Sequence, residues 1–378
     1  MAGRTGVNPE RILVVNAGSS SLKLRVLDTA DAVIGSADLA PPRGEEDAGV
    51  VGDAVSGLGR IDAVGHRIVH GGTAFLGPVR LDERVRSRIA ALTSLAPLHQ
   101  PKALTALDAV TAALPSTPAV ASFDTAFHAA MPEAAATYAI PAPWRQRWDL
   151  RRYGFHGLSH AYATRRAGEV LGVPVAELRL VTCHLGAGAS LAAVRGGRSV
   201  DTTMGFTPLE GLVMATRSGS VDPGLVLWLA DHVGMPPAEL AATLEHRSGL
   251  LGLAGTADMR EVLAGAEAGD GRRRLALDVY LHRLRSSIAS MTASLGGLDA
   301  IVFTGGVGER SAPIRAMTAD GLGYLGIDLD PARNAADGEG DREIGRAGAA
   351  VRALVIASRE DVQIAAEVRA VLGEAAAR

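Results

Sequence analysis

Residues 12–27 read Ile-Leu-Val-Val-Asn-Ala-Gly-Ser-Ser-Ser-Leu-Lys-Leu-Arg-Val-Leu. The first four are β-branched or apolar, and the small residues Asn16–Ser21 end that run abruptly. Residues 22–27 then alternate apolar and polar side chains, as a half-buried strand does. The stretch therefore predicts a strand, a tight turn of small residues and a second strand.

The same order of features returns later in the chain. Residues 180–183 predict a strand, 184–190 a small-residue turn, 191–194 a second strand, and 199–203 a third after the Gly-Gly hairpin at 196–197. Residues 300–303 predict a further strand, followed by a glycine turn at 304–309 and a helix that begins near Ser311. Helical patterns cover residues 81–95, 101–114, 272–295 and 362–377, whereas 321–346 is expected to be rich in loops. Two similar hairpin openings, far apart in the chain and separated by helices, indicate a duplicated α/β fold.

Composition limits the class of protein. A chain of 378 residues exceeds what one hydrophobic core usually serves, so we expect two domains. The formal charge of −3 gives no electrostatic case for nucleic acid or an anionic membrane as a partner. One cysteine, Cys183, excludes an intrachain disulfide framework, and no apolar run has the length of a signal peptide core or a bilayer span. These features predict a soluble, cytoplasmic protein with no membrane partner.

The three turns that follow apolar strands are candidate phosphate sites. Glycine allows close backbone approach, and consecutive N–H groups in such a turn form a nest for anions. Ser19, Ser20 and Ser21 add hydroxyl donors, and Lys23 adds a positive charge. For one turn alone, a plain tight hairpin is the favoured interpretation, but three such turns in one chain favour phosphate binding.

Cationic and acidic side chains near glycine form the second signal. Arg67 lies in Gly-His-Arg-Ile-Val-His-Gly-Gly and Arg217 in Thr-Arg-Ser-Gly, where a guanidinium can meet a phosphate or carboxylate, although a structural ion pair is the plain alternative. His156 and His160 have the i,i+4 spacing of a zinc pair, but no Glu follows His156, so donation to a phosphoryl oxygen is the preferred reading. Asp124 follows a short strand, where it could serve a site or cap a helix that begins at Thr125.

These residues resemble the acetokinase family, within the superfamily of actin, hexokinase and the heat-shock chaperone ATPases. The resemblance covers nearly the whole chain and keeps the family's order. The matching stretches are residues 15–23, 65–72, 95–99, 123–128, 151–160, 201–211, 216–219 and 303–309. The stretch Met-Gly-Phe-Thr-Pro-Leu-Glu-Gly at 204–211 is close to diagnostic of the family.

The resemblance implies two similar actin or ribonuclease H-like α/β domains with ATP bound in the cleft between them. Residues 1–147, joined by a returning helix at 363–378, would form the first domain, and residues 148–362 the second. The implied reaction is reversible, magnesium-dependent phosphoryl transfer from ATP to acetate by direct in-line transfer, which gives acetyl phosphate and ADP. Mn²⁺ can substitute for Mg²⁺ as cofactor, and the implied assembly is a homodimer.

Individual roles follow from the matching positions. Asp124, Arg67, Arg217 and His156 would be the catalytic residues. Asn16 and Glu360 would hold Mg²⁺, and Arg67, Val69, Leu98, His99, Phe155 and Pro208 would bind the substrate. The nucleotide-binding residues would be Ser19, Ser21, Lys23, His184, Leu185, Gly186, Ala187, Gly188, Asp258, Met259, Arg260, Gly306, Val307, Gly308, Glu309 and Arg310. Because the acceptor carboxylate, with a pKa of roughly 4.3, is ionised at pH 7, we expect Asp124 to orient another group rather than to act as a base.

Some positions depart from the family pattern. Ala187, Arg310 and Gln100 each stand where the family usually has asparagine. At Ala187 the side-chain amide donor is lost, which leaves backbone N–H groups to hold phosphate in the second turn. The acidic position Glu360 is kept. A propionate or other short-chain carboxylate kinase is one alternative, since an extra methylene changes binding by only roughly 1–3 kcal/mol. A non-catalytic, nucleotide-binding regulator of the same fold is the other.

Overall fold

The computed structural model describes residues 9–18, 21–40, 47–97, 99–336, 338 and 340–377. The chain divides into two compact units. Unit 1 comprises residues 1–129, 157–162 and 359–378, and unit 2 comprises residues 130–156 and 163–358. The domain boundary expected near residues 147 and 148 stays a prediction.

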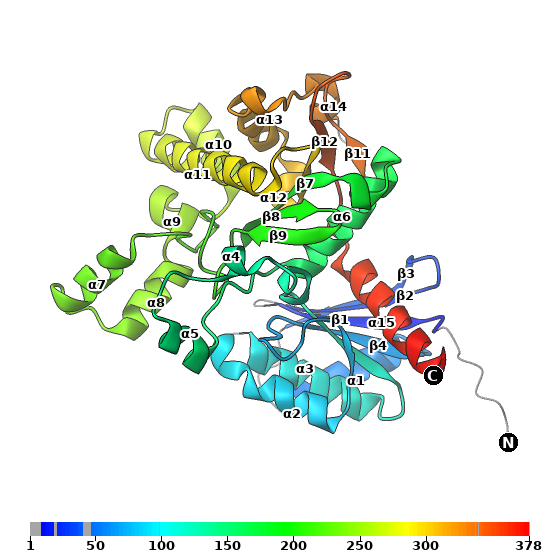
Figure 1. The fold of residues 1–378 in the computed structure, drawn as a ribbon. Coiled ribbons are helices and arrows are strands. Elements are labelled where there is room, and N and C mark those ends of the chain that lie inside the picture. Colours follow the sequence, from blue (N-terminus) through cyan, green and yellow to red (C-terminus); the bar gives the residue numbers. More distant parts are fainter. Residues whose placement is uncertain are drawn as a thin grey trace. The chain divides into compact units, whose positions relative to one another are not determined.

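Unit 1 is built on a mixed six-stranded sheet in the order β3-β2-β1-β4-β6-β5 (Figure 1). β1 pairs antiparallel with β2 and parallel with β4, and Asn16 faces Lys23 across the hairpin. The strands are β1 Ile12–Ala17, β2 Leu22–Leu27, β3 Val33–Leu39, β4 Ala63–Ile68, β5 Val79–Arg80 and β6 Ala119–Phe123. The two strands predicted within residues 12–27 are therefore confirmed.

Helices cover both faces of this sheet. One face packs against α3, which contacts α1 and α2, and the other against α15, which lies along β1, β4 and β6. The helices are α1 Ala48–Gly57, α2 Glu83–Ala91, α3 Gln100–Ala113 and α15 Glu360–Ala377, with short 3-10 turns at Thr93–Leu95 and Ala126–His128. Gly65 of β4 makes the α15 contact close, because an added Cβ would collide with Ile364 and lie 2.9 Å from a methyl of Val368. A side chain at residue 65 would therefore push α15 off the sheet.

Unit 2 repeats the sheet of unit 1. Its order is β11-β12-β10-β7-β8-β9, again an antiparallel meander joined to parallel strands. The strands are β7 Arg179–Leu185, β8 Ala189–Arg195, β9 Arg198–Thr202, β10 Ala300–Thr304, β11 Arg342–Glu343 and β12 Arg352–Val355. The expected duplication of an α/β fold is confirmed by this matching topology.

The helices of unit 2 include the long α11, which packs on β7, β8 and β9. The full set is α4 Glu133–Ala136, α5 Ala142–Trp148, α6 Gly157–Leu171 (whose first six residues belong to unit 1), α7 Pro223–Asp231, α8 Pro237–His246, α9 Gly249–Ala254, α10 Met259–Glu267, α11 Gly271–Leu295, α12 Gly305–Arg310, α13 Ala312–Asp320 and α14 Pro331–Ala335, with 3-10 turns at Val175–Glu177 and Gly323–Leu325. Among the described residues, no helix has the length and apolar character needed to cross a membrane.

Three local predictions need correction. The glycine segment after β10 is the helix α12 rather than a turn: Gly305 takes a φ of 76°, and the chain then coils directly. The second turn is shorter than expected, because β7 extends through Leu185 and β8 begins at Ala189. The helix expected over 81–95 ends at Ala91, and a separate 3-10 turn follows it.

Candidate active site

Arg67 is the centre of a polar cluster in unit 1. It projects from β4 on the face that carries α15, as Gly65 does, because alternate residues of a strand share a face. Its Nε and Nη2 donate to the two oxygens of Asp124 at 3.1 and 2.7 Å, and its Nη1 donates to Asn16 Oδ1 at 3.0 Å. Glu360 Oε2 lies 3.5 Å from the same Nη1. The guanidinium is therefore fixed from three sides, with the bidentate geometry that Arg and carboxylate prefer.

The Asp124 side chain pairs with Arg67 and does not cap the turn that follows it. Its backbone N–H bonds to Ile68 O at the end of β4, and the following 3-10 turn is capped at Thr125 without a side-chain bond. The helix-cap alternative for Asp124 is thus wrong. Burial raises the pKa of Asp124, an effect that Arg67 opposes. Burial alone would lower the pKa of Arg67, but the Asp124 and Glu360 carboxylates raise it above its ordinary value.

Asn16 and Glu360 meet although they are 344 residues apart in the chain. Asn16 is at the end of β1, Glu360 is the first residue of α15, and Asn16 Nδ2 donates to Glu360 Oε2 at 3.1 Å. Packing of α15 against Gly65 brings this carboxylate to the end of the strand. An amide oxygen and a carboxylate are hard ligands of the kind that Mg²⁺ takes when substrate phosphates and water complete its shell. This donor set fits the expected magnesium ion.

The second phosphate turn in unit 2 joins β7 to β8. Gly186 N–H donates to Gly188 O at 3.0 Å, and Ala187 is exposed at the tip. Around Gly188, an added Cβ would lie 3.3 Å from the ring of His156 and 3.5 Å from Nη1 of Arg217. The structure thus brings three of the expected residue groups together around one turn.

His156 is held in a rare conformation beside this turn. Its φ of 57° is in the left-handed region, and it forms the N-cap of α6. Its Nδ1 lies 2.9 Å from Ser190 Oγ, and its ring centre is 4.3 Å from that of His184. Strained backbone is often found at functional sites, so this conformation supports a role for His156.

Arg217 is a largely covered cation of unit 2. Its Nη1 donates to Pro208 O at 3.3 Å and lies 4.0 Å from Met214 Sδ. Within the part of the chain that the structure describes, it makes no ion pair. Burial lowers the pKa of Arg217, and Glu245 partly offsets this effect. A desolvated guanidinium of this kind is suited to an incoming anion.

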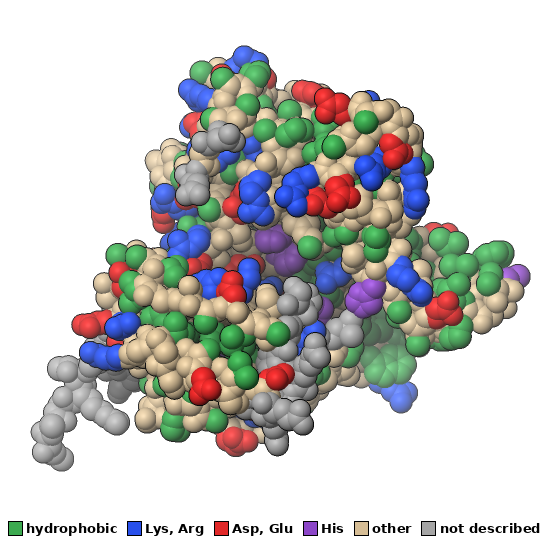
Figure 2. Space-filling model, turned by 180° about the vertical axis from the view of Figure 1, so that it is seen from behind, with side chains coloured by type: hydrophobic (Ala, Val, Ile, Leu, Met, Phe, Trp, Pro, Cys, Tyr) green, Lys and Arg blue, Asp and Glu red, His purple; other side chains and the backbone are tan. Residues whose placement is uncertain are grey.

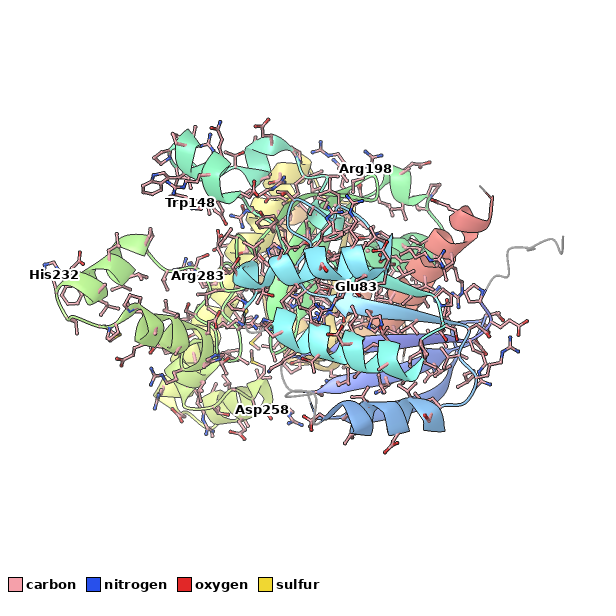
Figure 3. The ribbon with its side chains drawn as sticks, turned by 90° about the horizontal axis from the view of Figure 1, so that it is seen from below. Glu83, Trp148, Arg198, His232, Asp258 and Arg283 are labelled. Atoms are coloured by element: carbon pink, nitrogen blue, oxygen red, sulfur yellow. The ribbon has the colours of Figure 1, made fainter. Side chains whose placement is uncertain are left out.

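The residues expected to flank adenosine begin two helices of unit 2. Asp258 caps α10 by accepting from Arg260 N–H at 2.9 Å, and Figure 3 shows it at the start of that helix. Met259 is buried, while Arg260 bonds back to the Asp258 carboxylate. Residues 306–310 form α12, whose Glu309 accepts from Ser358 N–H at 2.9 Å.

The remaining predicted residues divide between the units. Lys23 is exposed on β2 and Ser21 O accepts from Gly18 N–H, which closes the first turn. Val69 and His99 belong to unit 1, and Phe155 and Pro208 to unit 2. Val69 and Phe155 are buried. Ser19, Ser20 and Leu98 lie outside the described residues.

Ser190 was missed as a site residue. The small-residue stretch 184–190 contained it, but no sequence signal linked it to His156, because that contact requires β8 to place it beside a residue 34 positions earlier. The described residues contain no group of three or more His, Cys, Asp or Glu side chains that could hold a metal ion.

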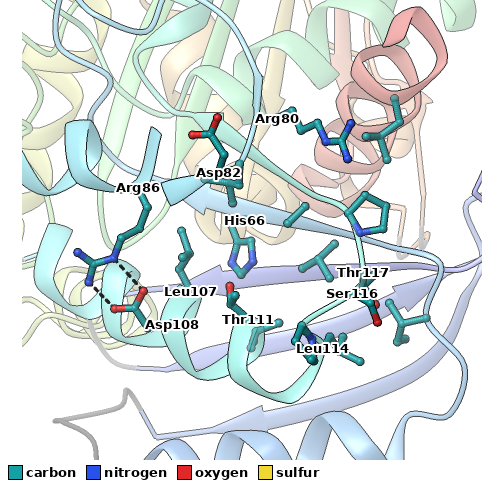
Figure 4. Close-up of a pocket in the computed structure, with 18 of the residues that line it drawn as sticks. His66, Arg80, Asp82, Arg86, Leu107, Asp108, Thr111, Leu114, Ser116 and Thr117 are labelled. Atoms are coloured by element: carbon teal, nitrogen blue, oxygen red, sulfur yellow. Dashed lines mark hydrogen bonds and ion pairs between the residues drawn. The ribbon is translucent and has the colours of Figure 1, made fainter. Parts of the chain in front are cut away.

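A separate hollow of about 1010 Å³ lies on the other side of the unit 1 sheet from Arg67 (Figure 4). His66 of β4 points into it, with Leu107 and Thr111 of α3 nearby and the Arg86–Asp108 ion pair at its edge. No predicted site residue lines this hollow. On the surface seen in Figure 2, acidic and basic side chains are interspersed, without a large patch of one sign.

Comparison with known proteins gives one consistent result. A model of the acetokinase family matches residues 52–366. An acetate kinase of Shouchella clausii is 46% identical over 82% of this chain and 79% of its own. The crystal structure of an acetate kinase from Porphyromonas gingivalis has a TM-score of 0.89 and 33% identity, over 96% of this chain and 100% of that one. A propionate kinase structure from Francisella tularensis has a TM-score of 0.88 and 35% identity, over the same shares of the two chains.

Proposed function

The chain belongs to the acetokinase family and is a kinase that acts on acetate, and we propose the residues and the route by which it does so. In the proposed step, an acetate oxygen bonds to the γ-phosphorus of ATP while the bond from that phosphorus to the bridging oxygen breaks. ADP leaves with the electron pair. The step is a direct in-line transfer, and its product besides ADP is acetyl phosphate.

Arg217 carries this proposal. It is a largely covered cation with no ion pair among the described residues, beside His156 and the Gly186–Gly188 turn. In phosphoryl transfer, the protein mainly positions the groups and stabilises charge on the equatorial oxygens. A guanidinium, an imidazole and a glycine turn supply those interactions. We assign Arg217 and His156 to the transferred phosphoryl group and the turn to the β- and γ-phosphates.

Arg67 is the proposed partner of the acceptor carboxylate. Asp124 holds two of its nitrogens and Asn16 a third, so the guanidinium has one orientation. The acceptor carboxylate is ionised at pH 7, with a pKa of roughly 4.3, so no general base is needed. Asp124 is then a positioning residue for Arg67, which explains its burial against the arginine rather than in open solvent.

Asn16 and Glu360 are the proposed protein ligands of Mg²⁺, a role that Mn²⁺ can take over. The bound ion supplies charge neutralisation for the nucleotide phosphates. Asn16 then has two tasks, since the oxygen that would meet the metal also accepts from Arg67. This arrangement would couple the metal site to the orientation of Arg67.

The nucleotide-binding assignment extends to three further segments. We propose that Ser19, Ser21 and Lys23 contact phosphate and that residues 258–260 and 306–310 flank the adenosine. Support comes from their place in the fold: residues 258–260 lie at the start of α10, and residues 306–310 follow directly on the end of β10 in the same unit.

Formation of acetyl hydroxamate tests the proposed reaction. The protein is incubated with Mg-ATP, acetate and hydroxylamine, and an Arg217→Ala variant serves as the matched negative. We expect product from the wild type and a loss of about 10³-fold or more in the variant, as for other arginines that stabilise charge in phosphoryl transfer. Absence of hydroxamate with every carboxylate up to butyrate would overturn the proposal.

Propionate is a second candidate substrate. Val69, an expected wall of the methyl pocket, is a small side chain, and a propionate kinase is among the similar solved structures. One methylene changes discrimination by only about 1–3 kcal/mol. We therefore expect measurable propionate activity with a lower kcat/KM than for acetate, determined in the same hydroxamate assay.

We also propose a homodimer in the cytoplasm. Hydrophobic side chains gather over the α7–α8 hairpin, at the right of Figure 2. They include Leu225, Leu227, Trp228 and Val233, which are 48–64% exposed. An exposed apolar patch of this kind is typical of an interface, and a second copy is the expected occupant. Light scattering of wild type and Trp228→Glu tests it: the wild type should have twice the monomer mass and the variant a lower one.

A further inference from the structure

The loop of residues 204–211, which carries Pro208, is held by three polar side chains that no family role accounts for. We infer that Tyr138, Arg152 and Glu210, here called the loop brace, position Pro208 and Arg217 for the acceptor substrate. This inference rests on the proposed function of Arg217. All three residues belong to unit 2.

The brace closes around the carboxylate of Glu210. Tyr138 Oη donates to Glu210 Oε2 at 2.5 Å, and Arg152 Nη2 donates to Glu210 Oε1 at 2.8 Å. Both carboxylate oxygens are therefore engaged, each by a residue from a segment 58 to 72 positions away in the chain. Burial and the Glu210 carboxylate raise the pKa of Tyr138, so its hydroxyl remains a donor.

The same groups also bind the backbone of the loop. Tyr138 Oη accepts from Phe206 N–H at 2.9 Å. Arg152 Nη1 donates to three successive carbonyls, those of Thr202, Thr203 and Met204, at 3.1–3.2 Å. The brace thus fixes the start of the loop through Arg152, its middle through Tyr138 and its end through Glu210.

Gly205 lets the loop pass inside the brace. An added Cβ would collide with both Glu210 and Tyr138, so no other residue fits without moving them. The Gly205 carbonyl accepts from Tyr153 N–H at 3.0 Å and from Gly154 N–H at 3.3 Å. The loop is thereby joined to the segment that leads into Phe155 and His156.

The brace reaches the proposed site through Pro208. Pro208 O is the oxygen that accepts from Arg217 Nη1, at 3.3 Å. Pro208 lies between Phe206, which Tyr138 holds, and Glu210, which Arg152 and Tyr138 hold. A shift of the loop therefore moves both the oxygen that accepts from Arg217 and the proline expected beside the substrate methyl. The Gly186–Gly188 turn has its own hydrogen bond, so we expect the phosphate side to be less affected.

A Tyr138→Phe variant tests the inference. It removes both hydroxyl bonds but keeps the ring over which the Arg152 guanidinium lies, at 5.6 Å. We expect kcat/KM for acetate to fall about tenfold, as for the loss of a hydrogen bond to a charged group, with KM for ATP changed less than about twofold. The ratio of propionate to acetate kcat/KM should rise, because a looser loop discriminates less on pocket size.

Tyr153→Phe is the matched control. It makes the same chemical change in the neighbouring segment, where Tyr153 Oη donates to Asp149 O at 2.8 Å, outside the brace. We expect its KM for acetate to stay within about twofold of the wild type. Glu210→Gln should retain more acetate activity than Glu210→Ala, since the amide keeps an oxygen for one of the two donors.

The outcomes separate a positioning role from a structural one. Equal losses toward acetate and ATP, or a lowered melting temperature with unchanged kinetics, would refute the inference, and so would the same loss in Tyr153→Phe. If Tyr138→Phe does not fold, the comparison of Glu210→Gln with Glu210→Ala decides in its place. A wild type without kinase activity would instead refute the proposed function.

Discussion

His66 makes a quantitative prediction about acid stability possible. It lies next to Arg67 on β4 but points to the opposite face of the sheet, into the hollow of Figure 4. The residue is 2% exposed, and its Nε2 has no hydrogen-bond partner among the described residues. Burial lowers the pKa of His66 from 6.5 to about 4. Replacing His66 with Leu removes this titrating group and leaves an apolar side chain of similar reach.

The sign follows from the direction of the shift. Between pH 6.5 and 4, the unfolded chain binds a proton at residue 66 that the folded protein does not, so the free energy of unfolding falls as the pH falls through this range. From a folded pKa of about 4 and an unfolded one of 6.5, the loss between pH 8 and pH 5 is about 2 kcal/mol. His70, whose pKa is also lowered by burial to about 4, adds a loss of its own that the variant keeps.

Hydrogen exchange of β1 and β4 peptides is the suitable assay. All three tryptophans, at 144, 148 and 228, belong to unit 2, so their fluorescence does not report on unit 1 directly. After correction for the intrinsic pH dependence of exchange, wild-type protection should fall about 30-fold more between pH 8 and pH 5 than that of His66→Leu. At pH 8, the two proteins should differ by less than about 1 kcal/mol, because a lost unsatisfied nitrogen offsets imperfect packing.

His246→Leu is the control, since it makes the same substitution at a side chain that is 61% exposed and belongs to unit 2, outside the β1 and β4 peptides. An identical loss of protection in wild type and His66→Leu would refute the reasoning. It would mean that His66 is solvated or hydrogen-bonded in solution and that its protonation does not change the free energy of unfolding.

Three further substitutions test the sites. Ala187→Asn adds an amide donor at the exposed tip of the second phosphate turn, so steady-state kinetics should show a KM for ATP lowered about threefold or more. An unchanged KM would contradict the assignment of this turn to phosphate binding. Arg67→Leu leaves Asp124 buried without its partner, so urea unfolding should show a free energy of unfolding lower by about 3–5 kcal/mol. Adding Asp124→Leu should largely restore stability but not hydroxamate formation. Activity in the double variant would exclude Arg67 from the reaction. Gly65→Ala forces a methyl against Ile364 and should lower the free energy of unfolding, measured by thermal unfolding, by about 1–3 kcal/mol. Adding Ile364→Ala should restore this stability. An unchanged stability of Gly65→Ala would show that α15 can move freely.

Individual strands and helices could be predicted from the sequence better than the contacts between them. Apolar runs bounded by small residues located β1, β7 and β10, and alternation of apolar and polar residues located β2, since those patterns depend on neighbours in the chain. The helix α12 was missed because glycines usually weaken a helix, and here Gly305 supplies the positive φ that lets one begin directly after β10.

Contacts between distant residues had no local signal. Glu360 was placed beside Asn16 only through the family resemblance, because nothing in either segment specifies a partner 344 positions away. Tyr138 gave no signal, and Glu210 entered only as part of the family-like stretch 204–211, because nothing in either segment specifies the other as a partner. The crowding at Gly205, where an added Cβ would collide with both side chains, is likewise visible only in the structure.

The helix α15 has a consequence for how the protein is made. β1 and β4 leave the ribosome early, whereas the helix that covers one face of their sheet is synthesised some 300 residues later. Until then, the face around Gly65 is open, and Arg67 and Asn16 lack the Glu360 carboxylate. Such a closure joins very distant segments and is entropically slow to form. Unit 1 therefore completes its folding and its proposed metal site in the same late event, and a nascent chain that stops short of α15 has neither.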